Sequence, residues 1–161
     1  MQSILMSIQE RHNKNIETGL KISELRTRPP KIKPPFRVYT YESGIFGRNK
    51  VVNEWICKSM TEWRICMGIP ATLPRNACVS VAEIRKYSGK DYKNITEMKI
   101  SDLKIYDKPK ELGEFRKEGF MTEEQWLYTL YPNTHCHYVA WAKRFEITRP
   151  PRSWCYVEEL E

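Results

Sequence analysis

The segment from Gly19 to Pro30 limits the possible folds of this chain more tightly than any other. Its glycine suits the residue that ends a helix, and the prolines at its far end cannot continue a strand, so a short strand is expected between them. Side chains alternate between the two faces of a strand. Glu24 and Arg26 therefore share one face and Lys21 faces the other way, unless a bulge or the start of the strand re-aims it. A strand with charge on both faces lies either at a solvated edge or along a polar cleft, and we favour the cleft.

Short strands and short helices alternate along the rest of the sequence. Hydrophobic patterning predicts strands over residues 4–8, 21–27, 36–42, 50–58, 94–100, 103–106, 136–148 and 153–157, with a turn at 107–110. Capping boxes, in which a serine or threonine and an acid or amide three residues later satisfy each other's backbone N–H groups, predict helices that begin after Ser7, Ser80 and Thr122. Residues 60–78 show no clear pattern. This balance predicts a single α+β domain over residues 1–161, built on a curled sheet or small barrel.

Composition excludes several other classes of protein. With 161 residues, 40% of them hydrophobic, the chain can bury a core without disulfide bonds. No apolar run approaches the roughly 20 residues that span a bilayer, and the first residues lack the basic region and cleavage site of a secretion signal. We therefore expect a cytoplasmic protein without membrane contact. The five cysteines are odd in number and scattered, which favours reduced thiols.

Positive charge gathers in the first quarter of the chain. The net charge is +7, and residues 1–38 contain eight Lys or Arg but only three Glu. A basic region attracts polyanions, so it predicts a nucleic-acid surface, with a solvated lysine-rich surface as the plain alternative. The candidates for that surface are Arg28, Lys31, Lys33 and Arg37. The proline-rich loop 29–35 is expected to be stiff, and it is either a rigid connection or a docking segment for a protein partner.

Three segments carry a resemblance to a known family. The first is Gly19-x-Lys21-x-x-Glu24-x-Arg26 behind a capped helix, and the others span residues 102–110 and 149–158. Together they resemble the ASCH domain, a branch of the PUA-like superfamily, in the form of the small stand-alone proteins carried by phages and bacteria. The resemblance implies a small curled β-barrel with short peripheral helices that handles RNA or modified nucleotides. It does not extend to residues 60–92.

One position of the motif bears on activity. A branch of the family resembles an amidohydrolase that deacetylates acetylcytidine, with a lysine at the position of Lys21, a threonine at the position of Glu24 and a distant glutamate. Glutamate lacks the hydroxyl nucleophile that the threonine would supply. Other members resemble RNA-binding modules, and ribonuclease activity is attributed to at least one. We therefore favour binding of RNA or a modified nucleotide over an amidohydrolase in which Lys21 is the base and Glu24 the acid or orienting group.

The candidate ligand-binding residues are Lys21, Glu24, Arg26, Tyr41 and Trp154. Arg26 can clamp a phosphate or a base edge with two parallel hydrogen bonds, and Glu24 can accept from an exocyclic amine. Lys21 can hold a phosphate, or act as a base if it is desolvated. A ring for stacking a base is expected from Tyr39, Tyr41 or Trp154. The alternative is that Glu24 and Arg26 form a structural pair that pins a helix to the barrel, and that Trp154 belongs to the core.

The sequence predicts neither a metal nor a cofactor. His135 and His137 share a strand face beside Cys136, but there is no Cys-x-x-Cys pair to complete a zinc site. Glycine-rich phosphate loops, His-Glu-x-x-His and Gly-x-Ser-x-Gly are also missing from the sequence. His12 is expected to face solvent on the helix that follows Ser7.

Overall fold

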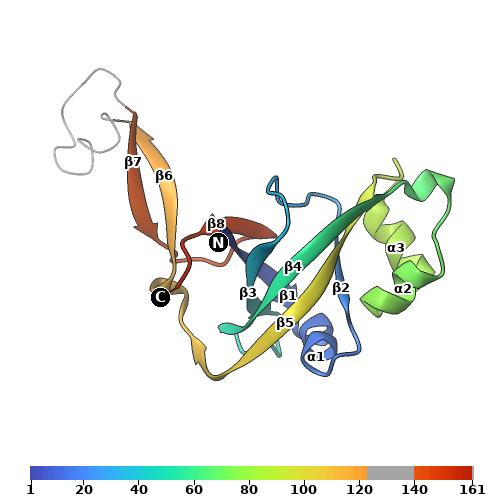
Figure 1. Ribbon diagram of the computed structural model, residues 1–161, viewed down its shortest axis with the longest axis horizontal. Coiled ribbons are helices and arrows are strands. Elements are labelled where there is room, and N and C mark those ends of the chain that lie inside the picture. The colour runs from blue at the N-terminus through green and yellow to red at the C-terminus, as the bar shows by residue number, and fades with distance from the viewer. Residues whose placement is uncertain (123–139, 161) are drawn as a thin grey trace.

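The computed structural model describes residues 1–122 and 140–160. Six strands form one sheet in the order β2-β5-β4-β3-β1-β8, and β6 and β7 form a separate two-stranded ribbon that extends away beside β8 (Figure 1). The strands are β1 (Ser3–Gln9), β2 (Ser23–Arg26), β3 (Phe36–Ser43), β4 (Val51–Trp63), β5 (Ile95–Lys110), β6 (Arg116–Thr122), β7 (Ala140–Glu146) and β8 (Trp154–Val157). The helices are α1 (Glu10–Glu17), α2 (Thr72–Ala77) and α3 (Val81–Ser88), with 3₁₀ turns at Ile65–Met67 and Leu112–Glu114.

The large sheet curls into a half-barrel. β1 runs parallel to β3, and the other neighbouring pairs of strands are antiparallel. β2 pairs with the first part of β5 and β8 pairs with β1, so β2 and β8 are the two edges of the sheet. The sequence predicts a curled sheet with a few short helices around it, and this expected α+β architecture is confirmed.

Three hydrophobic clusters fill the fold. The first surrounds Trp55 and includes Ile16 of α1, so it holds that helix against the sheet. The second lies around the edge-to-face pair of Tyr39 and Phe115, whose ring centroids are 5.0 Å apart. The third joins α2 and α3 to the sheet through residues such as Leu73. α2 and α3 therefore sit at the end of the sheet where β2, β4 and β5 meet (Figure 1).

A buried polar network fixes the position of α1. The side-chain amide of Asn13 donates to the carboxylate of Glu42 at 2.6 Å, and Asn53 donates to Asn13 at 2.8 Å. Arg48 completes the network with an ion pair to Glu42, also at 2.6 Å. Buried polar groups are costly unless they are paired, so this network specifies one register of the helix on the sheet.

Several expected boundaries differ from those observed: the strand expected over 50–58 continues to Trp63, the one expected over 21–27 is limited to Ser23–Arg26, and β6 was not expected. α1 begins at Glu10 rather than directly after Ser7, because β1 continues to Gln9, which pairs with Ser43. The Ser7 hydroxyl donates to the carbonyl of Pro151 at 2.6 Å and caps no helix. The strands expected over 94–100 and 103–106 and the turn at 107–110 are instead one long strand, β5.

The capping box at Ser80 is confirmed. The backbone N–H of Glu83 donates to the Ser80 hydroxyl at 3.1 Å, and the backbone N–H of Ser80 donates to the Glu83 carboxylate at 2.7 Å. The helix expected after Thr122 and the group at residues 135–137 lie outside the described residues. In the part of the chain that is described, no helix has the length and apolar character to cross a bilayer, and Cys57, Cys66, Cys78 and Cys155 are free thiols.

Candidate functional site

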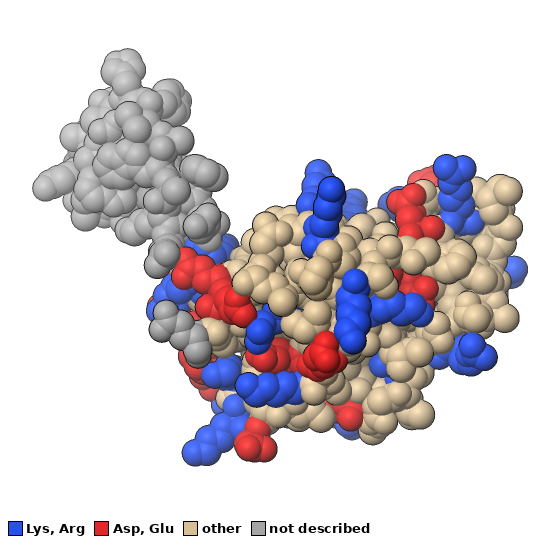
Figure 2. All heavy atoms as spheres, in the orientation of Figure 1, with Lys and Arg blue, Asp and Glu red and all other residues tan. Residues whose placement is uncertain are grey.

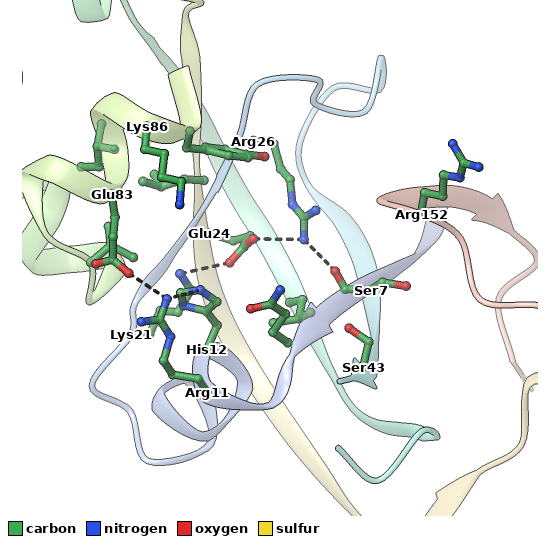
Figure 3. A pocket seen from close by; sticks show the side chains of 16 residues that line it. Ser7, Arg11, His12, Lys21, Glu24, Arg26, Ser43, Glu83, Lys86 and Arg152 are labelled. Atoms are coloured by element: carbon green, nitrogen blue, oxygen red, sulfur yellow. Dashed lines mark hydrogen bonds and ion pairs between the residues drawn. The ribbon is translucent and has the colours of Figure 1, made fainter. Parts of the chain in front are cut away.

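A cleft of about 660 Å³ lies on the open side of the half-barrel. β1, β2, α1 and α3 all contribute to its lining (Figure 3). Its position follows from the fold, because β2 and β8 are the two edges of the sheet and no backbone pairing joins them to close a barrel. The residues that line it are Ser7, Ile8, Gln9, Arg11, His12, Lys21, Glu24, Leu25, Arg26, Ser43, Val79, Glu83, Ile84, Lys86, Tyr87 and Arg152.

Three charged side chains form the floor of the cleft, and we refer to Lys21, Glu24 and Arg26 as the charged triad. Lys21 Nζ lies 3.1 Å from one carboxylate oxygen of Glu24, and Arg26 Nη2 lies 3.0 Å from the other (Figure 3). The three residues are only 3%, 7% and 9% exposed. Removing a charge from water is unfavourable unless an opposite charge and hydrogen bonds compensate it, so each member of the triad depends on the others.

The charges of the triad also set the ionisation of its carboxylate. Burial alone would raise the pKa of Glu24, but the neighbouring Lys21 and Arg26 outweigh burial and hold this pKa below its usual range. Glu24 is therefore ionised at neutral pH. Lys21 Nζ also donates to the backbone carbonyl of Ala77 at 2.9 Å, which ties the triad to the end of α2.

Lys21 lies on the same side as Glu24, in contrast to the simple alternation of a strand. β2 begins only at Ser23, and Lys21 belongs to the turn that precedes it. The backbone N–H of Lys21 donates to the carbonyl of Asn15 at 2.8 Å, which holds this turn against α1. The start of the strand therefore re-aims the lysine, and all three charged residues of the motif meet in one place.

Arg26 links the two edges of the sheet. Its Nη2 donates to the backbone carbonyl of Ser7 in β1 at 3.0 Å, and its Nη1 donates to the hydroxyl of Ser153, just before β8, at 3.1 Å. One guanidinium thus spans the open side of the half-barrel. Glu24 and Arg26 therefore form a structural ion pair and line the polar cleft at the same time.

Positive charge dominates the lining of the cleft. Arg11 of α1 pairs with Glu83 of α3 at 2.8 Å, and both side chains are partly exposed (Figure 3). Lys86 and Arg152 line the cleft without an ion-pair partner among the described residues. The lining contains five Lys or Arg and two Glu, which gives a net charge of +3 when His12 is neutral. A cavity of this kind attracts anions.

The aromatic ring in the cleft is that of Tyr87, on α3, which is 46% exposed. The structure places neither Tyr41 nor Trp154 in the cleft lining. Tyr41 is buried in the cluster that contains Tyr39, because its strand directs it into the core. Trp154 packs against the cluster of Trp55, and its indole N–H donates to the carbonyl of Arg28 at 2.7 Å.

His12 lines the cleft beside the charged triad, although the sequence suggests a solvated position. Burial and the charge of Lys21 lower its pKa, so the imidazole is neutral at pH 7. Its Nδ1 is buried without a hydrogen-bond partner in the described structure, and its Nε2 lies 3.3 Å from Arg11. The sequence did contain a signal, because His12 precedes the buried Ile16 by four residues and therefore shares its helix face.

The basic side chains expected on a nucleic-acid surface separate into two groups. Arg28, Lys31 and Lys33 are exposed, and none has an ion-pair partner among the described residues. Arg37 is partly buried and pairs with Glu54 at 2.7 Å and with Glu159 at 2.9 Å. Figure 2 shows basic side chains spread over one face of the molecule with acidic ones among them, so the charge on that face forms no single patch.

The remaining groups of the cleft limit its chemistry. Hydroxyl groups line it at Ser7, Ser43 and Tyr87, but the position at which the amidohydrolase branch has a threonine is the carboxylate of Glu24. Within residues 1–122 and 140–160, no group of three His, Cys, Asp or Glu side chains is arranged to hold a metal ion. The cleft therefore offers charge, a ring and hydrogen-bonding groups as its means of recognition.

Comparison with solved structures places this fold among ASCH domains. The crystal structure of ASCH from Zymomonas mobilis matches with a TM-score of 0.63 and 18% identity over 98% of this chain and 88% of the other. A tyrosine-to-phenylalanine mutant of the Zymomonas protein matches with a TM-score of 0.66 at 16% identity, over 99% of this chain and 92% of the other. No family model matches the sequence, and no curated protein matches it significantly. The resemblance that the sequence motifs carry is thus confirmed at the level of the fold.

Proposed function

We propose that this protein is a binding module that holds a nucleotide of RNA, or a modified nucleotide, in the cleft between α1, α3 and β2. The observation that carries the proposal is the net charge of +3 in the lining, with Lys86 and Arg152 free of carboxylate partners in the described structure. Charged clefts with low-dielectric walls focus the field on an incoming anion. The ASCH fold supports a nucleic-acid ligand, since the resemblance to that family implies handling of RNA.

Each part of a nucleotide has a matching group in the cleft. Lys86 and Arg152 can contact phosphate oxygens, and Arg11 can join them by exchanging Glu83 for the ligand. The ring of Tyr87 can stack on the base. The volume of about 660 Å³ falls inside the usual range for small-ligand sites, roughly 300–1,000 Å³, so one nucleotide fits better than a folded RNA element.

We assign the charged triad to the floor of this site and to recognition of the base. Arg26 and Lys21 already donate to Glu24 and to other oxygens, so they are not the main phosphate contacts. A carboxylate has about four acceptor positions, and Glu24 can therefore also accept from an exocyclic amine. Cytosine, adenine and guanine carry such an amine, and uracil does not. We expect the cleft to disfavour U.

Replacing Tyr87 with alanine should weaken binding of a short single-stranded RNA by about 1–3 kcal/mol, because the base loses its stacking partner. Tyr87→Phe keeps the ring and should bind nearly as well as the wild type. Fluorescence anisotropy with a labelled C- and A-containing hexanucleotide, at low salt, measures both variants. The control is Tyr92→Ala, since Tyr92 is a tyrosine of similar exposure that does not line the cleft. Equal weakening in the control, or wild-type protein that binds neither RNA nor nucleotides, would contradict the proposal.

A hydrolase acting on a modified nucleoside is the second candidate. It is favoured by the contact of 3.1 Å between Lys21 and Glu24 on the floor of a cleft, which would place a base and an acid or orienting group beside a bound ligand. The missing threonine hydroxyl weighs against it. Chromatography of acetylcytidine after incubation with the protein tests this candidate. Turnover that is absent, or equal in the wild type and Lys21→Ala, excludes the assigned roles.

A further inference from the structure

Two segments of the chain leave the cleft side by side. One continues from Arg26 at the end of β2 into the proline-rich loop 29–35, and the other continues from Arg152 into β8. Arg26 and Arg152 both line the cleft (Figure 3), so each segment begins at the proposed nucleotide site.

Hydrogen bonds join these segments step by step. The first is the contact of 3.1 Å from Arg26 to the Ser153 hydroxyl. The second runs from the Trp154 indole N–H to the carbonyl of Arg28 at 2.7 Å. The third runs from the backbone N–H of Lys31 to the Tyr156 hydroxyl at 3.2 Å. The two segments therefore run in the same direction and form one continuous surface that begins at the cleft.

The side chains on this surface suit a polyanion with exposed bases. Arg28, Lys31 and Arg152 are exposed and have no ion-pair partner among the described residues. Tyr156 is 45% exposed and packs edge to face against Trp154, with 5.1 Å between ring centroids, so its orientation is fixed. Cations that follow a backbone beside a fixed aromatic ring are the combination used to bind single-stranded nucleic acids. We refer to Arg28, Lys31 and Tyr156, which continue outward from Arg152 of the cleft, as the exit surface.

We infer that the exit surface is a second subsite, which binds the nucleotides that adjoin the one in the cleft, so that the ligand is a single-stranded RNA rather than a free nucleotide. This inference rests on the proposed function of the cleft. The four residue-to-residue steps from Arg152 to Tyr156 cover at most about 13 Å. At a stacked spacing of about 3.4 Å, that length holds about four nucleotides. The loop 29–35 is then part of the RNA site rather than a dock for a protein.

The inference is tested by the dependence of affinity on ligand length. Calorimetry measures the binding of a nucleoside monophosphate and of oligonucleotides of two to eight nucleotides to the full-length protein. All of these ligands carry the same base. Affinity should rise at least about tenfold between one and four nucleotides and then level off. Tyr156→Ala should remove about fivefold or more of the gain, consistent with the loss of one stacked base, and should leave the affinity for the monophosphate unchanged.

Two further variants separate stacking from an indirect effect on the loop. Tyr156→Phe keeps the ring but loses the hydroxyl that accepts from Lys31, and it should keep the length-dependent gain. If Tyr156→Phe instead behaves like Tyr156→Ala, the tyrosine acts by positioning the loop and the stacking subsite is refuted. Lys31→Ala should make the affinity for the longer oligonucleotides less sensitive to salt, by about 0.7 in the slope of log K against log salt.

The outcomes distinguish this inference from the function on which it rests. If the monophosphate binds but added nucleotides give no gain, the exit surface is not an RNA subsite and the proposed function stands. If the monophosphate and the oligonucleotides both fail to bind, the proposed function fails and the inference fails with it. If the oligonucleotides bind and Tyr156→Ala has no effect at any length, the RNA leaves the cleft over another surface. The proposal of the exit surface is then refuted.

Discussion

Replacing Glu24 with glutamine should lower the free energy of unfolding by about 3–5 kcal/mol, the usual cost of breaking a buried ion pair by removing one partner. Glutamine keeps the shape of the side chain but leaves Lys21 and Arg26 buried without a negative charge beside them. The consequences reach beyond the cleft, because Arg26 also spans the open side of the half-barrel to Ser7 and Ser153. Urea unfolding followed by tryptophan fluorescence measures the change.

The same carboxylate should make the wild type sensitive to acid. The pKa of Glu24 is lower in the folded protein than its ordinary value of 4.5, so the folded state stabilises the ionised form. That stabilisation is complete above the ordinary pKa and is lost as the pH falls through the lower folded pKa. Glutamine does not titrate, so the difference in stability between wild type and Glu24→Gln should shrink below about pH 4.5.

Asp107→Asn is the matched control for this experiment. Asp107 is an exposed carboxylate on β5, and its conversion to an amide should change stability by less than about 0.5 kcal/mol. If Glu24→Gln changes stability as little as the control does, the charged triad does not hold the half-barrel together. In that case the triad would act on the ligand alone, and the variant would show its effect only in binding.

The charged triad could be predicted from the sequence, but its partners could not. A strand of mixed charge between a glycine and two prolines pointed to a polar cleft, and Lys21, Glu24 and Arg26 do line one. Their other contacts are the carbonyl groups of Ala77 and Ser7 and the hydroxyl of Ser153. Every residue type presents a backbone carbonyl, so no sequence pattern marks these distant acceptors.

The orientation of α3, which forms the opposite wall of the cleft, could not be predicted from the sequence either. The capping box at Ser80 correctly predicts α3, but the pattern of that helix does not show that Lys86 and Tyr87 turn towards β2. That orientation depends on how the apolar residues of α2 and α3 pack on the sheet. The sequence made the rings of Tyr41 and Trp154 candidates for stacking a base. In the structure Tyr41 is buried in the core, and Trp154 is partly buried against it.

At the start of α1, strand pairing overrides the local capping pattern of the sequence. Ser7 and Glu10 have the spacing of a capping box, which would satisfy two backbone N–H groups of a helix. The backbone pairing of β1 with β3 continues as far as Gln9 and Ser43, and it satisfies the backbone of this segment instead. The difference affects the site, because it leaves the Ser7 carbonyl in β1, where it accepts from Arg26.

The double variant Lys86→Ala, Arg152→Ala should bind single-stranded RNA about 60-fold more weakly than the wild type at 50 mM salt and about tenfold more weakly at 200 mM. The reasoning follows from counterion release, in which each phosphate contact on a single strand contributes a slope of about 0.7 in log K against log salt. Two lost contacts therefore cost less as the salt concentration rises. Anisotropy titrations at both salt concentrations give the two ratios and the change in slope.

The control replaces two exposed lysines outside the cleft and the exit surface, Lys90 and Lys108, with alanine, so the net charge changes equally. If binding depends on overall charge alone, both double variants lose the same affinity and the cleft has no special role. If the cleft holds the phosphates, only Lys86→Ala, Arg152→Ala lowers the slope, by about 1.4. An equal loss at both salt concentrations would contradict ionic contacts at these two residues, since only released counterions make the ratio depend on salt.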